Sequence, residues 1–117
     1  MSERSIFRLE DMKQSIGNIR ALLDGRSFDT MRTDAVTRAA FERFLEILSE
    51  ASRHVPSEWK DSVAPNIPWR QIADLGNHIR HAYNKLDAEI LWNIYETDLD
   101  ALEIAVESML QQYRSGS

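Results

Sequence analysis

The chain has 117 residues, of which 43% are hydrophobic and 28% are charged, a composition typical of one small globular domain. It contains no cysteine, which excludes disulfides and thiolate metal sites, and no apolar run approaches the roughly 20 residues that span a bilayer. The net charge of −5 argues against broad nucleic-acid binding. The N-terminus lacks a signal-peptide pattern, so we expect a cytoplasmic protein without membrane contact.

Hydrophobic spacing predicts an all-α protein, because apolar residues recur every three or four positions and only four glycines and three prolines punctuate the chain. Helices are expected over 6–24, 34–54, 68–84, 88–95 and 99–113, with a loop or broken helical turn over 55–68. The natural packing is an up-and-down antiparallel bundle of four to five helices, in a single domain that spans residues 1–117.

Particular residues are expected to end and to bury these helices. Gly25 is a predicted C-cap, Thr33 or Asp34 begins the second helix, and Asp87 and then Thr97 or Asp98 cap the last two. The expected core faces are Ile6, Leu9, Met12, Ile16, Ile19 and Leu23 in the first helix, Val36, Ala40, Phe44, Ile47, Leu48 and Ala51 in the second, and Trp69, Ile72, Leu75, Ile79, Ala82 and Leu86 in the third.

Positive charge is concentrated in the region of the third helix. Residues 69–85 carry three basic residues against one acid, whereas residues 86–117 carry seven acids and one base. A locally basic helix on an acidic chain fits a small anionic target held at one site, rather than a long groove that follows a phosphate backbone.

The same helix gathers polar side chains that can hold a phosphate and move a proton. One face carries Arg70, Asp74, Asn77, His78, His81 and Lys85, and the neighbouring stripe carries Gly76, Arg80 and Tyr83. Histidine serves as general acid or base near neutral pH, and arginine grips a phosphate with two hydrogen bonds. These residue types match metal-free phosphodiester cleavage.

Simpler interpretations of these residues stay open. A polar face of this composition is also typical of any solvent-exposed helix. His78 and His81 with Asp74 suggest a metal pair, but no further ligand lies near them in the sequence, so no metal or other cofactor is predicted. Gly76 costs a helix interior about 1 kcal/mol relative to alanine, which indicates either close approach of a subunit or ligand or drift at an unimportant position.

The residues that follow carry a family resemblance. Ile67-Pro68-Trp69-Arg70, the Asn77 to Tyr83 segment and Ile90-Leu91-Trp92, with Glu46 to Ala51 earlier in the chain, resemble the HepT-like toxins of the HEPN superfamily. The resemblance covers about residues 5–112, and the combination of these segments is more specific than any one of them.

The resemblance implies a small helical bundle that forms a homodimer and acts as a metal-independent endoribonuclease, the toxin of a type VII toxin–antitoxin pair. The family's motif is an arginine, a polar residue, a histidine four to six residues after the arginine, and then a tyrosine, with two copies meeting to build the RNA cleft. In this chain Asn77 would be the polar helper, His81 the general acid or base and Tyr83 the motif tyrosine. The implied partner is an MntA-like minimal nucleotidyltransferase antitoxin, which transfers AMP to that tyrosine.

The chain departs from the motif at Gly76, which stands where the arginine is expected. Arg80 lies one turn later, and its long side chain can reach back toward that place, from its own subunit or across a two-fold axis. Arg70, Asp74 and His78 would form a supporting polar face. Two hypotheses stand beside an active nuclease: a catalytically degenerate HEPN domain that binds or regulates a nucleotidyltransferase, and a helical dimer with an unrelated scaffolding role.

Overall fold

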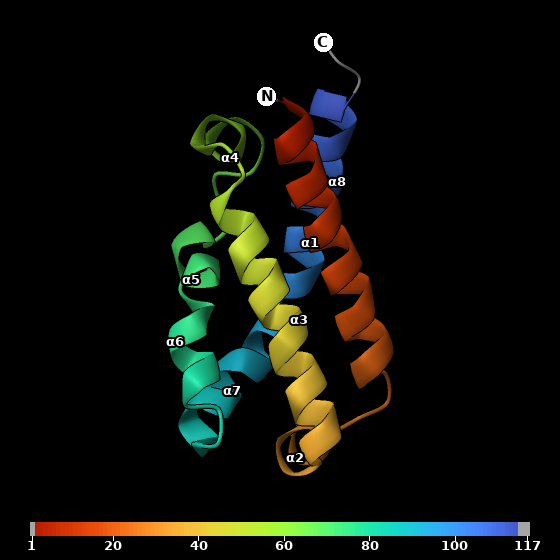
Figure 1. Ribbon diagram of the computed structural model, residues 1–117, viewed down its shortest axis with the longest axis vertical. Helices are drawn as coiled ribbons and strands as arrows, with labels where there is room; N and C mark the ends of the chain where they lie inside the picture. Colours follow the sequence, from red (N-terminus) through yellow and green to blue (C-terminus); the bar gives the residue numbers. More distant parts are fainter. Residues whose placement is uncertain (1, 115–117) are drawn as a thin grey trace.

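The chain folds into helices joined by short turns (Figure 1). The computed structural model describes Ser2 to Arg114, and this range contains no strand. The segments are α1 (Ser2–Leu23), α2 (Phe28–Thr33), α3 (Ala35–Arg53), α4 (Ser57–Val63), α5 (Trp69–Ala73), α6 (Leu75–Arg80), α7 (Lys85–Asn93), the π-helical η1 (Ile94–Asp98) and α8 (Leu99–Arg114). The all-α prediction is confirmed. The predicted number of helices is wrong, since eight α-helical segments and one π-helical segment lie in the described range.

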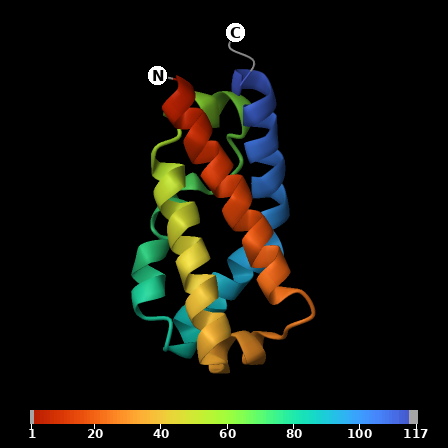
Figure 2. The ribbon, with the colours of Figure 1, turned by 45° about the vertical axis from the view of Figure 1, so that its right-hand side comes forward.

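These segments make four antiparallel passes along a molecule that measures 46 × 23 × 21 Å. In Figures 1 and 2, α1 runs away from the end where α8 finishes, and α3 returns toward it. The pair α5 and α6 then runs down, and α7, η1 and α8 run back up. Among the helices between Ser2 and Arg114, none combines the length and the apolar character needed to cross a membrane.

The core face predicted for α1 is confirmed, and so are two of the predicted helix ends. Leu9, Met12, Ile16, Ile19 and Leu23 are fully buried, and Ile6 is partly buried. Gly25 has a φ of 73°, the left-handed conformation that ends a helix without strain when the residue is glycine. The Asp34 side chain caps α3 by accepting hydrogen bonds from the Thr37 backbone N–H at 3.1 Å and from the Thr37 hydroxyl.

The core face predicted for α3 is wrong for four of its six residues. The buried residues are Thr37, Phe41, Leu45, Leu48, Ser49, Ala51 and Ser52. Of the predicted set, only Leu48 and Ala51 are buried, Ala40, Phe44 and Ile47 are half-buried, and Val36 is 78% exposed. The error arises because two apolar stripes lie side by side on this helix. The stripe through Phe41 and Leu45 is the one that packs in the core.

The single helix predicted over 68–84 is also wrong, because it breaks at Asp74 into α5 and α6. The Asn77 N–H bonds to the Asp74 carbonyl at 3.1 Å, which frees the Ala73 carbonyl that a continuous helix would use. That carbonyl accepts hydrogen bonds from the Ser49 hydroxyl at 3.1 Å and from the Arg53 guanidinium at 3.1 Å (Nε) and 2.7 Å (Nη2). We call this arrangement the Ala73 clamp. It satisfies a backbone group that would otherwise lose its partner.

The second half of that predicted helix ends early. α6 finishes at Arg80, and residues 81–84 form a turn. Asn84 caps α7, since its side-chain oxygen accepts a hydrogen bond from the Leu86 N–H at 2.9 Å. The cap predicted at Asp87 is therefore wrong. Leu86, predicted to be in the core, lies in the first turn of the new helix α7 and is 66% exposed.

The two helices predicted over 88–95 and 99–113 are one continuous helical stretch from Lys85 to Arg114. The predicted caps Thr97 and Asp98 lie inside it, in the π-helical turn η1. The wider π-helical turn brings residues five apart to one side, so that Ile94 and Leu99 are both buried. The 55–68 segment contains the short helix α4, which agrees with a broken helical turn rather than an open loop.

Removing the donors of the Ala73 clamp should destabilise the fold. In the double variant Ser49→Ala, Arg53→Ala, the Ala73 carbonyl loses its side-chain partners, and we expect the free energy of unfolding to fall by about 1–3 kcal/mol. Urea denaturation followed by circular dichroism measures this. Arg43→Ala is the control, because Arg43 lies on the same helix in an exposed pair with Glu46 at 3.6 Å. Equal effects of the two changes would contradict the clamp.

Candidate active site

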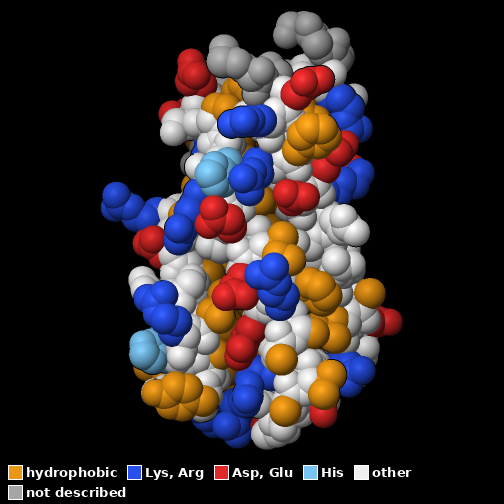
Figure 3. All heavy atoms as spheres, in the orientation of Figure 1, with side chains coloured by type: hydrophobic (Ala, Val, Ile, Leu, Met, Phe, Trp, Pro, Cys, Tyr) orange, Lys and Arg blue, Asp and Glu red, His pale blue; other side chains and the backbone are white. Residues whose placement is uncertain are grey.

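The candidate site lies at the end of α6 and in the turn that follows. His81 is the C-cap residue of α6 and is exposed. Tyr83 is 74% exposed, and its ring lies edge-on to the His81 ring, with centroids 6.3 Å apart. Ala82 between them is buried and anchors the turn in the core, so both rings face solvent. Figure 3 shows basic, histidine and hydrophobic side chains adjoining at this end of the molecule.

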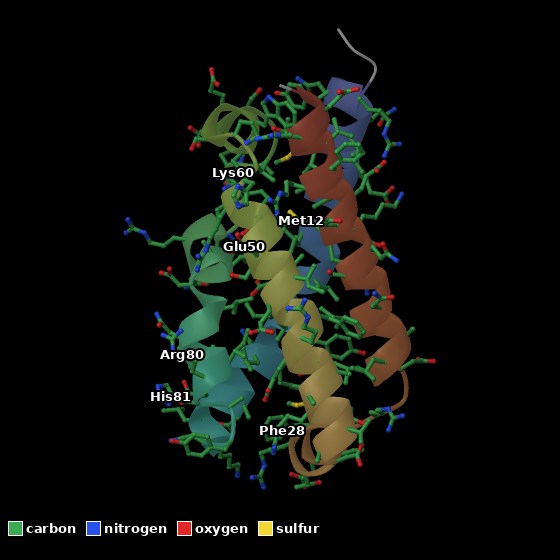
Figure 4. All side chains as sticks on the ribbon, in the orientation of Figure 1. Met12, Phe28, Glu50, Lys60, Arg80 and His81 are labelled. Atoms are coloured by element: carbon green, nitrogen blue, oxygen red, sulfur yellow. The ribbon has the colours of Figure 1, made fainter. Side chains whose placement is uncertain are left out.

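The Arg80 side chain turns back along α6 toward Gly76. Its Nη1 atom lies 3.9 Å from the position that a Cβ on Gly76 would occupy. Its Nη2 atom donates a hydrogen bond to the side-chain oxygen of Asn77. Figure 4 shows Arg80 and His81 projecting from the outer side of α6 and its end. A guanidinium therefore lies beside the backbone position from which the family's motif arginine would start.

A groove of about 780 Å³ opens between α5 and α6 on one side and α7 and η1 on the other. Its walls are lined by Arg70, Gln71, Asp74, Leu75, Asn77 and His78 and by Leu86, Glu89, Ile90, Asn93, Ile94 and Asp98. Leu86 and Ile90 leave apolar surface exposed in it, with exposed fractions of 66% and 37%. The groove therefore combines an apolar patch with charges of both signs.

His78 and Asp87 pair across the contact between α6 and α7. The ring Nδ1 of His78 lies 2.8 Å from an Asp87 carboxylate oxygen, and the two side chains are 37% and 21% exposed. Sequence analysis missed this pair and assigned Asp87 to a helix end. No helical spacing could indicate it, because nine residues and a turn separate the partners.

The structure divides the predicted polar face between two sides of α6. Asn77, Arg80, His81 and Tyr83 belong to the outer side and the turn, whereas Arg70, Asp74 and His78 line the groove. Asn77 contributes to both, because it also lines the groove. Lys85 is exposed at the start of α7. Over Ser2 to Arg114, no group of three or more histidine, aspartate or glutamate side chains is placed to hold a metal ion.

The third histidine, His54, is the C-cap residue that follows α3, and it lies outside this groove. The His54 Nε2 atom lies 3.0 Å from a Glu50 carboxylate oxygen, and this hydrogen bond holds the pKa of the Glu50 carboxyl below its ordinary value. The chain thus contains a second histidine–carboxylate pair, which serves below as a matched control for the His78–Asp87 pair.

Known proteins resemble the chain over most of its length. A family model described as "Ribonuclease HepT-like" matches residues 12–109. The "Probable ribonuclease HepT" of Thermococcus cleftensis is 33% identical over 101 residues, which cover 86% of this chain and 91% of that protein. The "Putative RNase MJ1380" of Methanocaldococcus jannaschii is 29% identical over 108 residues, covering 92% of this chain and 98% of the relative. No solved structure gave a significant match.

Gly76 can be replaced by alanine within one subunit. A Cβ there would make only an ordinary contact with Arg80, and Gly25 is the one residue in the described range with a positive φ. Gly76→Ala should therefore raise the free energy of unfolding by up to about 1 kcal/mol, because alanine favours the helix. Thermal and urea denaturation measure the change.

Gly17→Ala is the control for this substitution, since no atom lies within 4 Å of a Cβ at Gly17 in α1. Both variants should gain stability. A loss at Gly76 alone would contradict the expectation and show that another molecule or subunit packs against that backbone.

Proposed function

The chain belongs to the HepT-like ribonuclease family, and from this premise we propose that it is an endoribonuclease that cleaves RNA without a metal ion. The observation that carries the proposal is the joint presence of the Arg80 guanidinium, the Asn77 amide and the His81 ring at the exposed end of α6. The Thermococcus cleftensis relative is named as a probable ribonuclease, which is the same class of enzyme.

The proposed reaction is attack of a ribose 2′-hydroxyl on the adjacent phosphate. His81 accepts the proton of that hydroxyl, which makes the oxygen a stronger nucleophile. Its exposed position after the last turn of α6 leaves room for an RNA strand to approach.

Arg80 holds the phosphate in this scheme. A guanidinium offers paired donors that match two phosphate oxygens, and its charge offsets the charge that develops in the transition state. The Asn77 side chain accepts a hydrogen bond from Arg80 and so fixes its direction. Arg80 thus supplies beside Gly76 the positive charge that the family motif supplies with an arginine at that position.

We further propose that the active form is a homodimer. The apolar surface of Leu86 and Ile90 lies in the groove next to the candidate site, where a second copy would cover it. Two copies meeting there would form one RNA cleft from both turns. A protein that is monomeric in solution at the concentration where it cleaves RNA would contradict this.

The proposed biological role is the toxin of a toxin–antitoxin pair whose MntA-like nucleotidyltransferase partner transfers AMP to Tyr83. The exposure of Tyr83 supports this, because an acceptor hydroxyl must reach the active site of a second enzyme. A bound AMP would place a bulky anion beside His81 and repel an RNA phosphate.

The second candidate function is a catalytically degenerate domain that binds the nucleotidyltransferase without cleaving RNA. Gly76 favours it, because the motif arginine is replaced. Both candidates keep Tyr83 and the dimer, so only cleavage itself separates them.

Cleavage of RNA by the purified chain, with and without EDTA, tests the nuclease. We expect cleavage in both conditions, and a loss of about 10²- to 10⁴-fold in His81→Ala, which removes the proposed base. Arg80→Ala should lose about 10²- to 10³-fold, because the transition-state charge loses its partner. In cells, His81→Ala should relieve growth arrest on overexpression.

His54→Ala is the matched control, because it removes a histidine at the end of α3 away from the candidate site, and it should leave cleavage unchanged. An inactive wild-type chain contradicts the nuclease proposal. If Gly76→Arg then gains cleavage, the degenerate alternative is correct.

Modification of Tyr83 is tested with an MntA-like nucleotidyltransferase and ATP. Mass spectrometry should detect one or more AMP groups on the wild-type chain and none in Tyr83→Phe, while Tyr95→Phe, a half-buried tyrosine in η1, should be modified like the wild type. Modification of Tyr83→Phe to the same extent would rule out this acceptor. Absence of modification in the wild type would favour the scaffolding hypothesis.

A further inference from the structure

The His78–Asp87 pair has the geometry of a proton-transfer site, and it has no role in the reaction proposed above. The Asp87 carboxylate lies 2.8 Å from Nδ1 of the ring, and because a carboxylate only accepts, Nδ1 carries the proton and donates a hydrogen bond to Asp87. The other ring nitrogen, Nε2, makes no hydrogen bond with a protein group in the described range, and His78 lines the groove. His78 therefore lies at the wall of the groove with its Nδ1 held by Asp87 and its Nε2 not used by the protein there.

A carboxylate on Nδ1 does two things for a histidine. It fixes the ring orientation and the tautomer, and it stabilises the imidazolium form, as in the serine-protease triad. The pair joins two elements, with His78 in α6 and Asp87 in the first turn of α7, and it is only partly exposed. Its geometry therefore depends on the fold rather than on one flexible side chain.

The charged groups that line the groove are mostly negative, which limits what can enter beside His78. Arg70 from α5 adds a positive charge, while Asp74, Glu89 and Asp98 add negative charges from three other segments. The carboxylates disfavour a polyanion that fills the whole groove. The first ribose and base of the leaving strand are uncharged, and only this part of the strand need lie beside His78, so it avoids the repulsion.

We propose that His78 is the general acid of the cleavage reaction and that Asp87 is its positioning residue. The inference rests on the proposed nuclease function. The 2′-oxygen gives its proton to His81 and forms a bond to phosphorus. The bond from phosphorus to the 5′-oxygen then breaks, and that oxygen takes the proton from Nε2 of His78. The products are a 2′,3′-cyclic phosphate and a free 5′-hydroxyl. Exchange with water then restores both rings.

Two histidines three positions apart suit this division of work. A phosphoryl transfer with in-line geometry needs a base at the attacking oxygen and an acid at the leaving oxygen, on different sides of the phosphorus. His81 is the exposed C-cap residue of α6, and His78 lies one turn earlier at the wall of the groove, so the phosphate would have to bind at the edge between the outer side of α6 and the groove. Asn77 and Arg80 are close in sequence to both, with their hydrogen bond on the same helix.

The experiment compares two RNA substrates of the same sequence, one with the natural 5′-oxygen at the scissile bond and one with sulfur in its place. A thiolate leaves without protonation because thiols are far stronger acids than alcohols, so the sulfur substrate needs no general acid. His78→Gln should slow cleavage of the oxygen substrate by about 10²- to 10⁴-fold and cleave the sulfur substrate nearly as fast as the wild-type chain. Asp87→Asn should show the same selective loss to a smaller extent.

His54→Gln is the matched control, because it alters the other histidine–carboxylate pair, and both substrates should be cleaved at the wild-type rate. Circular dichroism confirms that each variant is folded, and Asp87→Asn carries the test if His78→Gln is not. Equal loss on both substrates would mean that the pair only holds α6 against α7, and no loss on either would mean that it is idle. Both results overturn the inference. A wild-type chain that cleaves neither substrate overturns the nuclease proposal instead.

Discussion

The arrangement of the candidate site depends on one carbonyl group. The Ala73 carbonyl is released where the helix breaks, and a released peptide carbonyl inside a protein needs another donor. Ser49 and Arg53 on α3 supply it. Because the break lies directly before α6, it sets the direction of that helix, and with it the side on which His78 meets Asp87 and the side on which Arg80 projects. The position of the polar residues thus begins with a contact made on a different helix.

The continuous helix from α7 to α8 provides the opposite wall. The π-helical turn η1 keeps Ile94 and Leu99 in the core although five residues separate them, and it places Asp98 at the groove. An uninterrupted α-helix would rotate one of these apolar residues away from the core. The groove is therefore bounded by two local departures from regular α-helix. One is the break at Asp74, where side chains of α3 bond the freed Ala73 carbonyl, and the other is the π-helical turn η1.

Predictions from the sequence are confirmed where the local structure depends only on residues within one helix or at its ends. The buried face of α1, the left-handed Gly25 and the Asp34 cap follow from local spacing and local chemistry. Predictions from the sequence are wrong where the local structure depends on a residue far away in the chain. The break at Asp74 is stabilised by side chains more than twenty positions earlier, and the core face of α3 is a choice between two adjacent apolar stripes. In the site, the sequence and the resemblance identified Asn77, His81 and Tyr83 as candidates, but the His78–Asp87 pair crosses a turn and has no periodic signal.

The anchoring of Arg80 has a consequence for control of the molecule. An arginine at position 76 would lie in the first turn of α6, next to the break at Asp74, whereas Arg80 is the last residue of α6, next to the turn that holds Tyr83. Helix ends fray more readily than helix interiors. In the proposed scheme, the arginine that binds phosphate and the tyrosine that accepts AMP therefore lie in one short segment that opens and closes together. A modification or a partner that changes the conformation of that turn would therefore also move the Arg80 guanidinium, without contacting the guanidinium itself.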